Sequence, residues 1–240
     1  MDFSKLTWRD VEEYLKRNKD VILPLGSVEE HGYHLPLTTD GDIALAIANE
    51  LGRRLNILVA PIVWYGVSSS TRDYPGSVMV EFDSLRNYLR DIISSLVGQG
   101  FRRIFIISGH LSSLQISAIR DAAKNFDAEF YLLNYSKIDF SNILETKPCH
   151  ACEAETSLML YLYPNKVEME NAVDEEPIFE KYSLKTLRPT DSGVFGYATK
   201  ASKEKGKKMF ERIIEEFENF IRSVRENERW KYKSDNCGRG

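Results

Sequence analysis

Four histidines are the residues of this 240-residue chain best suited to metal binding or acid–base chemistry. They are His31, His34, His110 and His150, and each lies close to glycine, proline or acidic residues. At neutral pH an imidazole can bind a divalent ion or carry a proton, and a neighbouring carboxylate can share either task. A single loop histidine usually does neither, so the case for a site depends on whether several of them converge.

The first histidine cluster lies in the motif GSVEEHGYHLPLTTD. Glu29 and His31 are two positions apart, so in an extended chain both side chains point to the same side and can converge on one ion. Asp40, at the start of the next predicted helix, is near enough in sequence to return to that place. Glu30 is expected to point away from Glu29, and His34 is either a further functional residue or a hydrogen-bonded loop histidine.

The other two clusters also lie next to predicted elements. His110 follows a strand and a glycine, in the motif SGH. In the motif PCHACEAETS, His150 precedes Glu153 and Glu155, which lie in or before the first turn of a helix. Those two carboxylates could serve the site, or they could only complement the helix dipole, which is worth about 0.3–1 kcal/mol.

Two further motifs suggest other chemistry. Cys149 and Cys152 around His150 resemble half of a zinc knuckle or a redox pair, but the third cysteine, Cys237, is isolated near the end of the chain. The sequence Asp40-Gly41-Asp42 resembles a short motif of sugar-nucleotide enzymes, a pattern too common to be specific.

The elements predicted around these clusters alternate between strand and helix. Short apolar runs predict strands at 20–25, 57–64, 103–108 and 129–133. Helical spacing of apolar residues predicts helices after an N-cap at Thr7 and at 42–55, 85–97, 112–126, 153–163 and about 200–225. This alternation predicts a single α/β domain with a mostly parallel sheet flanked by helices on both faces. The carboxyl ends of parallel strands share one edge, so the first two histidine clusters should meet there.

The composition argues against several classes of protein. The chain has 36 acidic and 32 basic side chains, so it lacks the basic excess that nucleic-acid binding requires. Its longest apolar run, 57–65, is about half a membrane span and contains Pro61. Three cysteines and a charged N-terminal segment predict a cytoplasmic protein without a disulfide framework or a signal peptide. We expect the domain to occupy residues 1–230 and a disordered tail to occupy 231–240.

Taken together, the motifs resemble the creatininase (creatinine amidohydrolase) family. The resemblance lies in LGSVEEHGYHLPLTTD, SGH, HACEAETS and SGVFGYATKASKEKG, over roughly residues 20–220. It implies a creatininase-like α/β fold, a homo-oligomer and a divalent-metal centre that opens amide bonds of a small-molecule substrate. Members include creatinine hydrolases, archaeal deformylases of a formamidopyrimidine ribotide in flavin and deazaflavin biosynthesis, and a peptidase of mycofactocin maturation.

The resemblance also implies roles for individual residues. Those similar to the family's metal ligands are Glu29, His31, Asp40 and His110, which would hold one or two ions of Zn, Fe or Mn. Asp40 resembles the aspartate that bridges two ions. His150 resembles the histidine that donates a proton or holds the substrate, and Glu155 resembles the acidic residue behind it, which would orient that imidazole.

Two departures from creatinine hydrolases bear on the substrate. Ser112 stands where creatininase proper has a metal-binding glutamate, which puts full occupancy of a second metal site in question. The tryptophans between the second and third motifs are also absent, since this chain has Trp8, Trp64 and Trp230 only. Both departures fit the deformylase branch, so the predicted reaction is hydrolysis of the formamide bond of the ribotide. Creatinine or peptide hydrolysis, and a non-catalytic metal- or ligand-binding paralogue, are the alternatives.

Four residues remain as candidates for substrate binding. They are His34, Ser112, Glu153 and Arg72. Arg72 follows the polar loop at 68–71, which could supply hydrogen-bond donors to a phosphate group.

Overall fold

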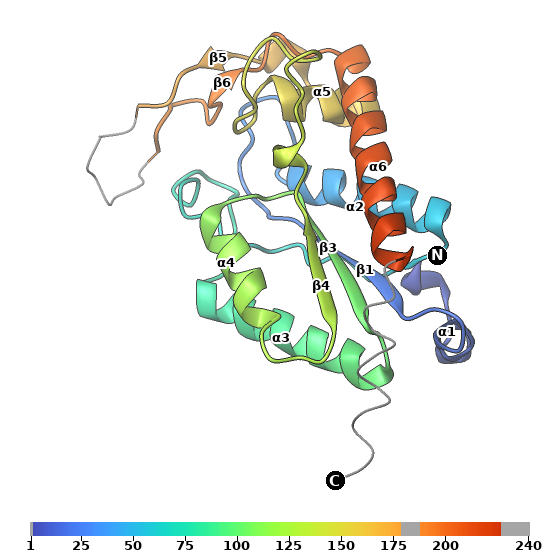
Figure 1. Ribbon diagram of the computed structural model, residues 1–240. Helices are drawn as coiled ribbons and strands as arrows, with labels where there is room; N and C mark the ends of the chain where they lie inside the picture. Colours follow the sequence, from blue (N-terminus) through green and yellow to red (C-terminus); the bar gives the residue numbers. More distant parts are fainter. Residues whose placement is uncertain (1, 179–187, 227–240) are drawn as a thin grey trace.

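A parallel sheet of four strands forms the centre of the computed structural model, which describes residues 2–178 and 188–226 (Figure 1). The strands are β1 (Asp20–Leu25), β2 (Leu58–Val59), β3 (Arg103–Ser108) and β4 (Glu129–Leu133), and their spatial order is β2-β1-β3-β4. β1 and β3 pair along their whole length, from Asp20 opposite Arg103 to Leu25 opposite Ser108. Their carboxyl ends therefore lie side by side.

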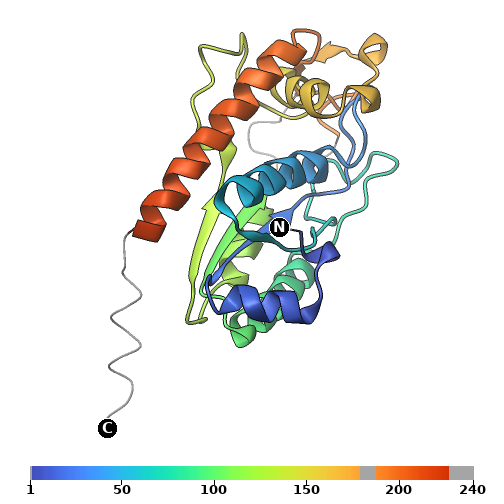
Figure 2. The ribbon, with the colours of Figure 1, turned by 90° about the vertical axis from the view of Figure 1, so that its right-hand side faces the viewer.

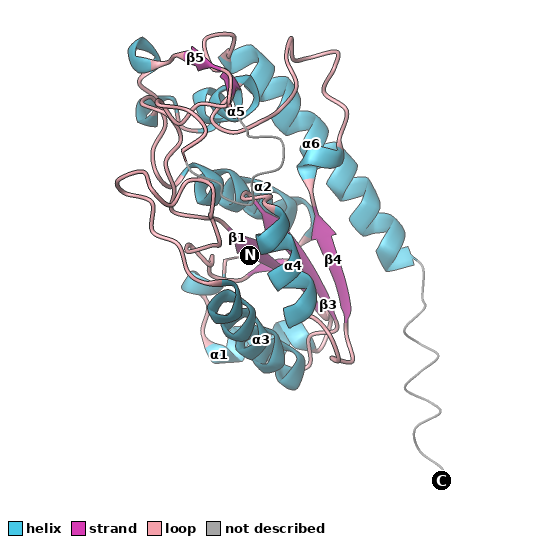
Figure 3. Ribbon diagram, turned by 90° about the vertical axis from the view of Figure 1, so that its left-hand side faces the viewer, coloured by secondary structure: helices cyan, strands magenta, loops and turns pink. Residues whose placement is uncertain are grey.

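Helices cover both faces of this sheet. One face packs against α2 (Thr39–Leu55), α5 (Glu153–Leu162) and α6 (Lys203–Glu226), which lie on the side seen in Figure 2. The other face packs against α1 (Trp8–Leu15), α3 (Phe82–Gln99) and α4 (Ser113–Ala122), and Figure 3 shows α3 and α4 in front of the strands. Along β1, Ile22 belongs to the first core and its neighbours Val21 and Leu23 to the second. Because successive strand residues point to opposite faces, a strand buried on both sides is an unbroken apolar run.

The predicted α/β fold with a parallel sheet flanked by helices is confirmed. β1, β3 and β4 have the predicted bounds, and Thr7 caps α1 in a reciprocal capping box with Asp10. The second strand is wrong in length, since β2 covers only Leu58–Val59 of the stretch predicted at 57–64, and Val63 adds an isolated bridge to Leu25. Pro61 follows soon after and has no backbone N–H to offer a ladder.

Several helix boundaries differ from the prediction by up to four residues, among them those of α3, which spans Phe82–Gln99 rather than 85–97. α2 begins at Thr39 rather than at residue 42, so Asp40 lies within its first turn. α4 ends at Ala122 rather than near residue 126, and Asn125 there has a left-handed backbone with φ of 66°. A residue in that conformation cannot continue a right-handed helix.

Short elements that the sequence did not predict complete the described residues. β5 (Asp174–Glu175) and β6 (Gly196–Tyr197) form an antiparallel pair, and single 3₁₀ turns lie at η1 (Phe3–Lys5), η2 (Tyr135–Lys137), η3 (Pro164–Lys166) and η4 (Met169–Asn171). The tail predicted at 231–240 lies outside the described residues. No helix in the described part of the chain has the length and apolar character needed to cross a bilayer.

Close backbone packing brings the two strand ends and the start of α2 together. A Cβ atom on Gly109 would lie 2.0 Å from the carbonyl oxygen of Asp40, and one on Gly26 would lie 2.5 Å from the Cα of Gly41. Only glycine can be accommodated at such distances. The glycines that follow β1 and β3 thus let the backbone at the start of α2 pack directly against the ends of both strands.

Candidate metal centre

Six side chains converge beyond the carboxyl ends of β1 and β3. They are Glu29 and His31 from the loop after β1, Asp40 from α2, His110 from the residues after β3, His150 from the loop before α5, and Glu155 from the first turn of α5. Their donor atoms form three groups, each within 4.8 Å: Glu29, His31 and His150; Glu29, Asp40 and His110; His31, Asp40 and Glu155. The structure therefore brings together the four residues that the sequence predicts as metal ligands, and all four are buried.

His110 turns one ring nitrogen to the backbone and the other to two carboxylates. Its Nε2 lies 3.0 Å from the carbonyl oxygen of Val67, closer than the hydroxyl of Ser68 at 3.4 Å. A carbonyl only accepts, so the neutral ring carries its proton on Nε2. Its Nδ1 then presents a lone pair 2.8 Å from Oε1 of Glu29 and 3.2 Å from Oδ2 of Asp40. Three electron-rich atoms that face one another require a cation between them, either a proton or a metal ion.

The carboxylate of Glu29 is only half satisfied by hydrogen bonds from the chain. Oε2 accepts a hydrogen bond of 2.7 Å from the hydroxyl of Thr71. Oε1 is buried and has no hydrogen-bond partner among the described residues, although Nδ1 of His110 lies 2.8 Å away. Buried carboxylate oxygens normally have a partner, so Oε1 is the atom available to a cation.

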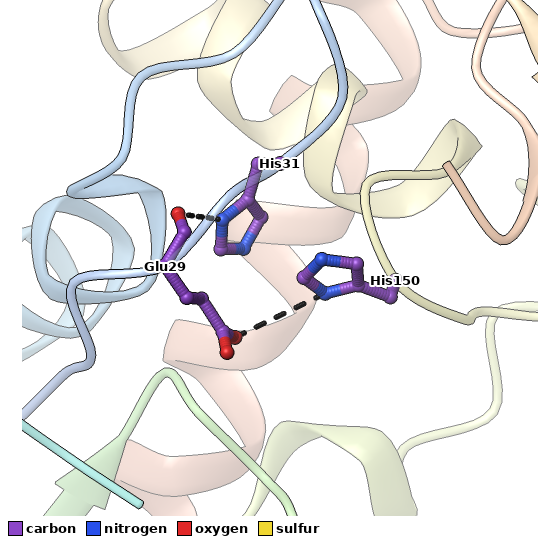
Figure 4. A group of neighbouring side chains, drawn as sticks. All are labelled: Glu29, His31 and His150. Carbon is purple, nitrogen blue, oxygen red and sulfur yellow. Dashed lines mark hydrogen bonds and ion pairs between the residues drawn. The ribbon is translucent and has the colours of Figure 1, made fainter. Parts of the chain in front are cut away.

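His31 repeats the arrangement of His110 (Figure 4). Its Nδ1 donates to the carbonyl oxygen of Glu29 over 3.0 Å, which leaves the lone pair of the neutral ring on Nε2. That Nε2 lies 3.3 Å from Oδ1 of Asp40 and 3.9 Å from Oε2 of Glu155. Nitrogen donors fixed in this way by a backbone carbonyl are typical of metal-binding histidines.

Asp40 lies between the two histidines and faces each with a different oxygen. Oδ1 faces His31, and Oδ2 faces His110 and also accepts a 2.5 Å hydrogen bond from Ser27. Glu155 is fixed in turn by the backbone N–H of Ala151, at 2.6 Å from its Oε2. The donors therefore form two adjacent groups that share one carboxylate. Two imidazole nitrogens with three carboxylates fit divalent Zn, Fe or Mn.

Burial and charge act in opposite directions on these groups. Burial opposes protonation of His31, but Asp40 and Glu155 outweigh it and raise the pKa of His31 to about 10. For His110, Glu29 likewise overcomes burial, and the pKa is well above its usual value. Burial acts to raise the pKa of Asp40, yet the two histidines hold that pKa well below its usual range. A divalent ion must therefore displace imidazole protons when it binds.

His150 faces the same centre from the opposite side (Figure 4). Its ring lies 4.5 Å from that of His31, and its Nδ1 lies 4.0 Å from Oε1 of Glu29. Its Nε2 lies 2.9 Å from both the backbone oxygen and Oε1 of Glu30. Burial and His31 act to lower the pKa of His150, but the hydrogen bond to Glu30 and the neighbouring carboxylates raise it.

This geometry corrects two expectations. The residue that holds His150 is Glu30, which was expected to point away and is instead 6% exposed, with its Oε1 against Nε2 of His150. Glu155 has no hydrogen bond to His150 among the described contacts and groups with His31 and Asp40. In the motif VEEHG, the loop bends at Gly32, whose φ is 67°, so the strict alternation of an extended strand does not hold there.

A cavity of about 310 Å³ opens onto these groups. Its wall includes Glu29, Asp40, His110, His150 and Glu155, together with hydroxyl and apolar side chains, among them Ser70, Ser112, Tyr135, Phe140 and Phe195. The volume is in the range of small-molecule sites. Water and a substrate thus have access to both donor groups and to Nδ1 of His150.

The four candidate substrate-binding residues differ in position, and only Ser112 lines the cavity. Its hydroxyl caps α4 and donates to the carbonyl oxygen of Val67 over 3.0 Å, so it acts as a helix cap beside the metal ligands. His34 pairs with Thr156, and Glu153 is fully buried against the backbone at 145–146. Arg72 is exposed at 54% of its side chain and follows the cavity-lining Thr71.

A buried glutamine that sequence reasoning missed connects the loops of the site. Nε2 of Gln115 donates to the carbonyl of Gly26 and to the hydroxyl of Ser108, both over 3.0 Å. Its Oε1 accepts from the N–H of Val67 over 2.9 Å. Gln115 thereby fixes Val67, the residue whose carbonyl orients His110. Its place in the apolar pattern of α4 gave no signal of this role.

The remaining motifs take no part in the donor groups. Cys149 lines the cavity, and its N–H donates to Sγ of the buried Cys152 over 3.0 Å. Burial raises the pKa of Cys152 to about 12, which keeps it a thiol. Asp42 is buried in the first turn of α2, where it accepts hydrogen bonds from Thr38 and Lys166.

Comparison with known proteins gives the same assignment as the donor set. Residues 4–221 match the creatininase family model, described as creatinine amidohydrolase. A 3-dehydro-scyllo-inosose hydrolase from Thermotoga maritima is 28% identical over 93% of this chain and 83% of its own length. Creatinine amidohydrolase from Pseudomonas putida is 26% identical over 91% of this chain and 95% of its own. A mycofactocin precursor peptide peptidase from Mycobacterium ulcerans is 28% identical, over 82% of each chain.

Solved structures agree with the fold. A tryptophan-to-phenylalanine mutant of creatininase matches with a TM-score of 0.85 and 26% identity, over 93% of this chain and 98% of that one. Other matching creatininase structures include a form with zinc at both positions, a manganese form and a complex with creatine. The chain therefore belongs to the creatininase family of metal-dependent amidohydrolases, and its buried histidines and carboxylates are candidate ligands for zinc or manganese.

Proposed function

We propose that this enzyme hydrolyses the C–N bond of a formamide, with the formamidopyrimidine ribotide as its substrate. The observation that carries the proposal is the pair of donor groups sharing Asp40, which open into one cavity opposite Nδ1 of His150. Amide hydrolysis needs an activated water, a polarised carbonyl and a proton for the leaving nitrogen. The arrangement offers a place for all three.

Two metal ions held by Glu29, His31, Asp40, His110 and Glu155 would polarise the carbonyl and lower the pKa of a water from 15.7 towards about 7. Hydrolysis would join the oxygen of that water to the carbonyl carbon and break the C–N bond, and the proton that the water gives up would pass to solvent in the cavity. Nδ1 of His150 supplies the proton that the leaving nitrogen takes up. Both partners of Nε2 are acceptors, so only Nδ1 exchanges a proton during the reaction.

Several features of the cavity support the ribotide over creatinine. Ser112 is engaged as a helix cap, which agrees with its departure from the glutamate of creatinine hydrolases. Phe140 and Phe195 line the wall and offer apolar surface to a planar pyrimidine. The phosphate would lie at the mouth, where Ser70 lines the cavity and Arg72 lies next in the loop after Thr71.

The direct test is formate release from the formylated ribotide by the zinc- or manganese-loaded enzyme, with creatinine and a short peptide run in parallel. We expect turnover of the ribotide and none of creatinine. Arg72→Ala should raise KM for the ribotide with little change in kcat, because it removes a contact to the phosphate only. Turnover of creatinine or the peptide, with none of the ribotide, would overturn the substrate assignment. A homo-oligomeric state and a cytoplasmic location stay predictions.

A further inference from the structure

The carboxylate of Glu30 is held in place on every side. Oε1 lies 2.9 Å from Nε2 of His150, and Oε2 accepts from the N–H of Gly32 over 2.9 Å. Its backbone N–H donates to the hydroxyl of Ser77 over 3.0 Å. A Cβ atom on Gly193 would lie 1.7 Å from Oε2, so the segment around Gly193 packs directly against the carboxylate. A buried charge with this many constraints has one geometry.

Glu30 contacts the site only through His150. It is not a member of any of the three donor groups, although it lies between two residues that are. It also does not line the cavity, whereas His150 does. The backbone of His150 is also fixed, since its carbonyl oxygen accepts a hydrogen bond of 2.9 Å from the N–H of Phe195. The position of the imidazole is therefore set by the contact of its Nε2 with Glu30 and by the hydrogen bond of its backbone to Phe195.

We propose that Glu30 is a positioning residue of the reaction, which holds His150 with Nδ1 toward the substrate and stabilises the imidazolium by its hydrogen bond to Nε2. This role rests on the proposed function, in which His150 supplies the proton for the leaving nitrogen. When Nδ1 loses its proton, Nε2 keeps its own, and the ring remains bonded to Glu30. The backbone oxygen of Glu30 maintains the tautomer, so the carboxylate contributes chiefly its charge and its hold on the ring.

The test is a double-mutant cycle between Glu30→Gln and His150→Ala, measured as formate release from the ribotide. Glu30→Gln should lower kcat by about 10- to 100-fold with little change in KM, as for other hydrogen-bond partners behind a catalytic group. In the His150→Ala background the same substitution should have no further effect, because its only route to the substrate is gone. An equal loss of rate in both backgrounds would show a merely structural role and overturn the proposal.

A spectroscopic measurement separates this proposal from the substrate assignment. In the zinc-loaded enzyme, proton NMR should show a downfield imidazole N–H signal that is missing in His150→Ala and moves upfield in Glu30→Gln. A signal that does not respond to Glu30→Gln would contradict the hydrogen bond, whatever the substrate. If the signal behaves as expected but the ribotide is not turned over, the proposed function fails and the positioning of His150 stands.

Two variants guard against trivial explanations. Glu13→Gln, which removes the same charge from an exposed ion pair on α1, should leave kcat and metal content unchanged. Glu30→Asp keeps the charge but withdraws it from Nε2 by one methylene group, so its kcat should also fall. Metal content by mass spectrometry should equal that of the unmodified enzyme for Glu30→Gln, and loss of metal would overturn the proposal.

Discussion

The two ends of strand β1 carry buried carboxylates with very different partners. At the amino end, Asp20 is fully buried, and its two oxygens bond to Nε of Arg103 at 2.7 Å and to Nε of Arg225 at 2.6 Å. Beyond the carboxyl end, the described residues offer Glu29 and Asp40 no guanidinium or ammonium group, and the partners of the two carboxylates are imidazoles and hydroxyl groups. Guanidinium groups are charged at every accessible pH, whereas imidazoles can exchange their protons.

The difference shows that the buried ion pairs that stabilise the fold and the buried donors of the candidate metal centre lie at opposite ends of β1. The amino end is closed by permanent ion pairs that the chain supplies itself. At the carboxyl end the chain supplies donors whose positive partners are exchangeable. In this protein, a buried carboxylate therefore indicates a functional site where its partners are imidazoles, whose protons a metal ion can replace.

The largest expected effect comes from removing the shared carboxylate. Asp40→Ala should abolish metal binding and turnover together, because both donor groups lose a member. Metal content by mass spectrometry and formate release by a coupled assay are the two measurements. Far-ultraviolet circular dichroism serves as the control for folding. Full metal content with retained turnover in this variant would disprove the assignment of a metal centre to this end of β1. His31→Ala should likewise lose both metal and turnover.

The second effect concerns proton supply rather than metal. His150→Ala should lower kcat by about 10²- to 10⁴-fold and leave the metal in place, because the four predicted ligands do not include it. Metal analysis and steady-state kinetics on the same preparation measure the two quantities. Loss of the metal in this variant would instead make His150 a ligand, as its 4.0 Å separation from Glu29 permits.

The third effect concerns the opposite end of the strand. Asp20→Ala should lower the free energy of unfolding by about 3 kcal/mol, because it leaves two guanidinium groups without their buried partner. Both guanidiniums reach solvent in part, so the loss should be at the lower end for buried pairs. Urea denaturation followed by circular dichroism measures it. Metal content should not change, and a variant that loses metal without losing stability would refute the separation of the two ends.

The smallest effect is a dependence of metal affinity on pH. The pKa of His31 is raised to about 10, so below that pH a metal ion must displace a proton from this ring. The affinity should therefore rise with pH between pH 6 and 8, by about tenfold per pH unit for each proton released. Calorimetry in buffers of different ionisation enthalpy counts those protons. An affinity independent of pH would mean that the imidazoles are already neutral.

Much of the fold could be predicted because its strands are buried on both faces. DVILPL and RIFIIS contain no polar residue in their centres, and the structure gives both strands the predicted bounds. The same pattern misled at 57–64, since an apolar run does not reveal where hydrogen bonding stops. Helix ends such as Asn125 depend on single backbone angles that periodicity does not report.

The members of the site could be identified from the sequence, but their pairing could not. Glu29, His31, Asp40 and His110 follow two strands that must share an edge, so their convergence follows from topology. That Glu30, rather than Glu155, bonds to His150 depends on the bend of the loop at Gly32 and on the position of the first turn of α5. Gln115 was out of reach, because its bonds go to backbone atoms of Gly26 and Val67, which are distant in sequence, and to the hydroxyl of Ser108.

Helix α6 contacts both the segment that carries His150 and the amino end of β1. Near its start, Lys205 pairs with Glu153 at 2.6 Å, in the segment that carries His150, and near its end Arg225 pairs with Asp20. Because α6 follows every other described element in the sequence, neither contact can form until those elements have left the ribosome. During synthesis, Glu153 and one oxygen of Asp20 should therefore stay without these cationic partners until α6 has emerged, whereas the pair of Asp20 with Arg103 can form earlier.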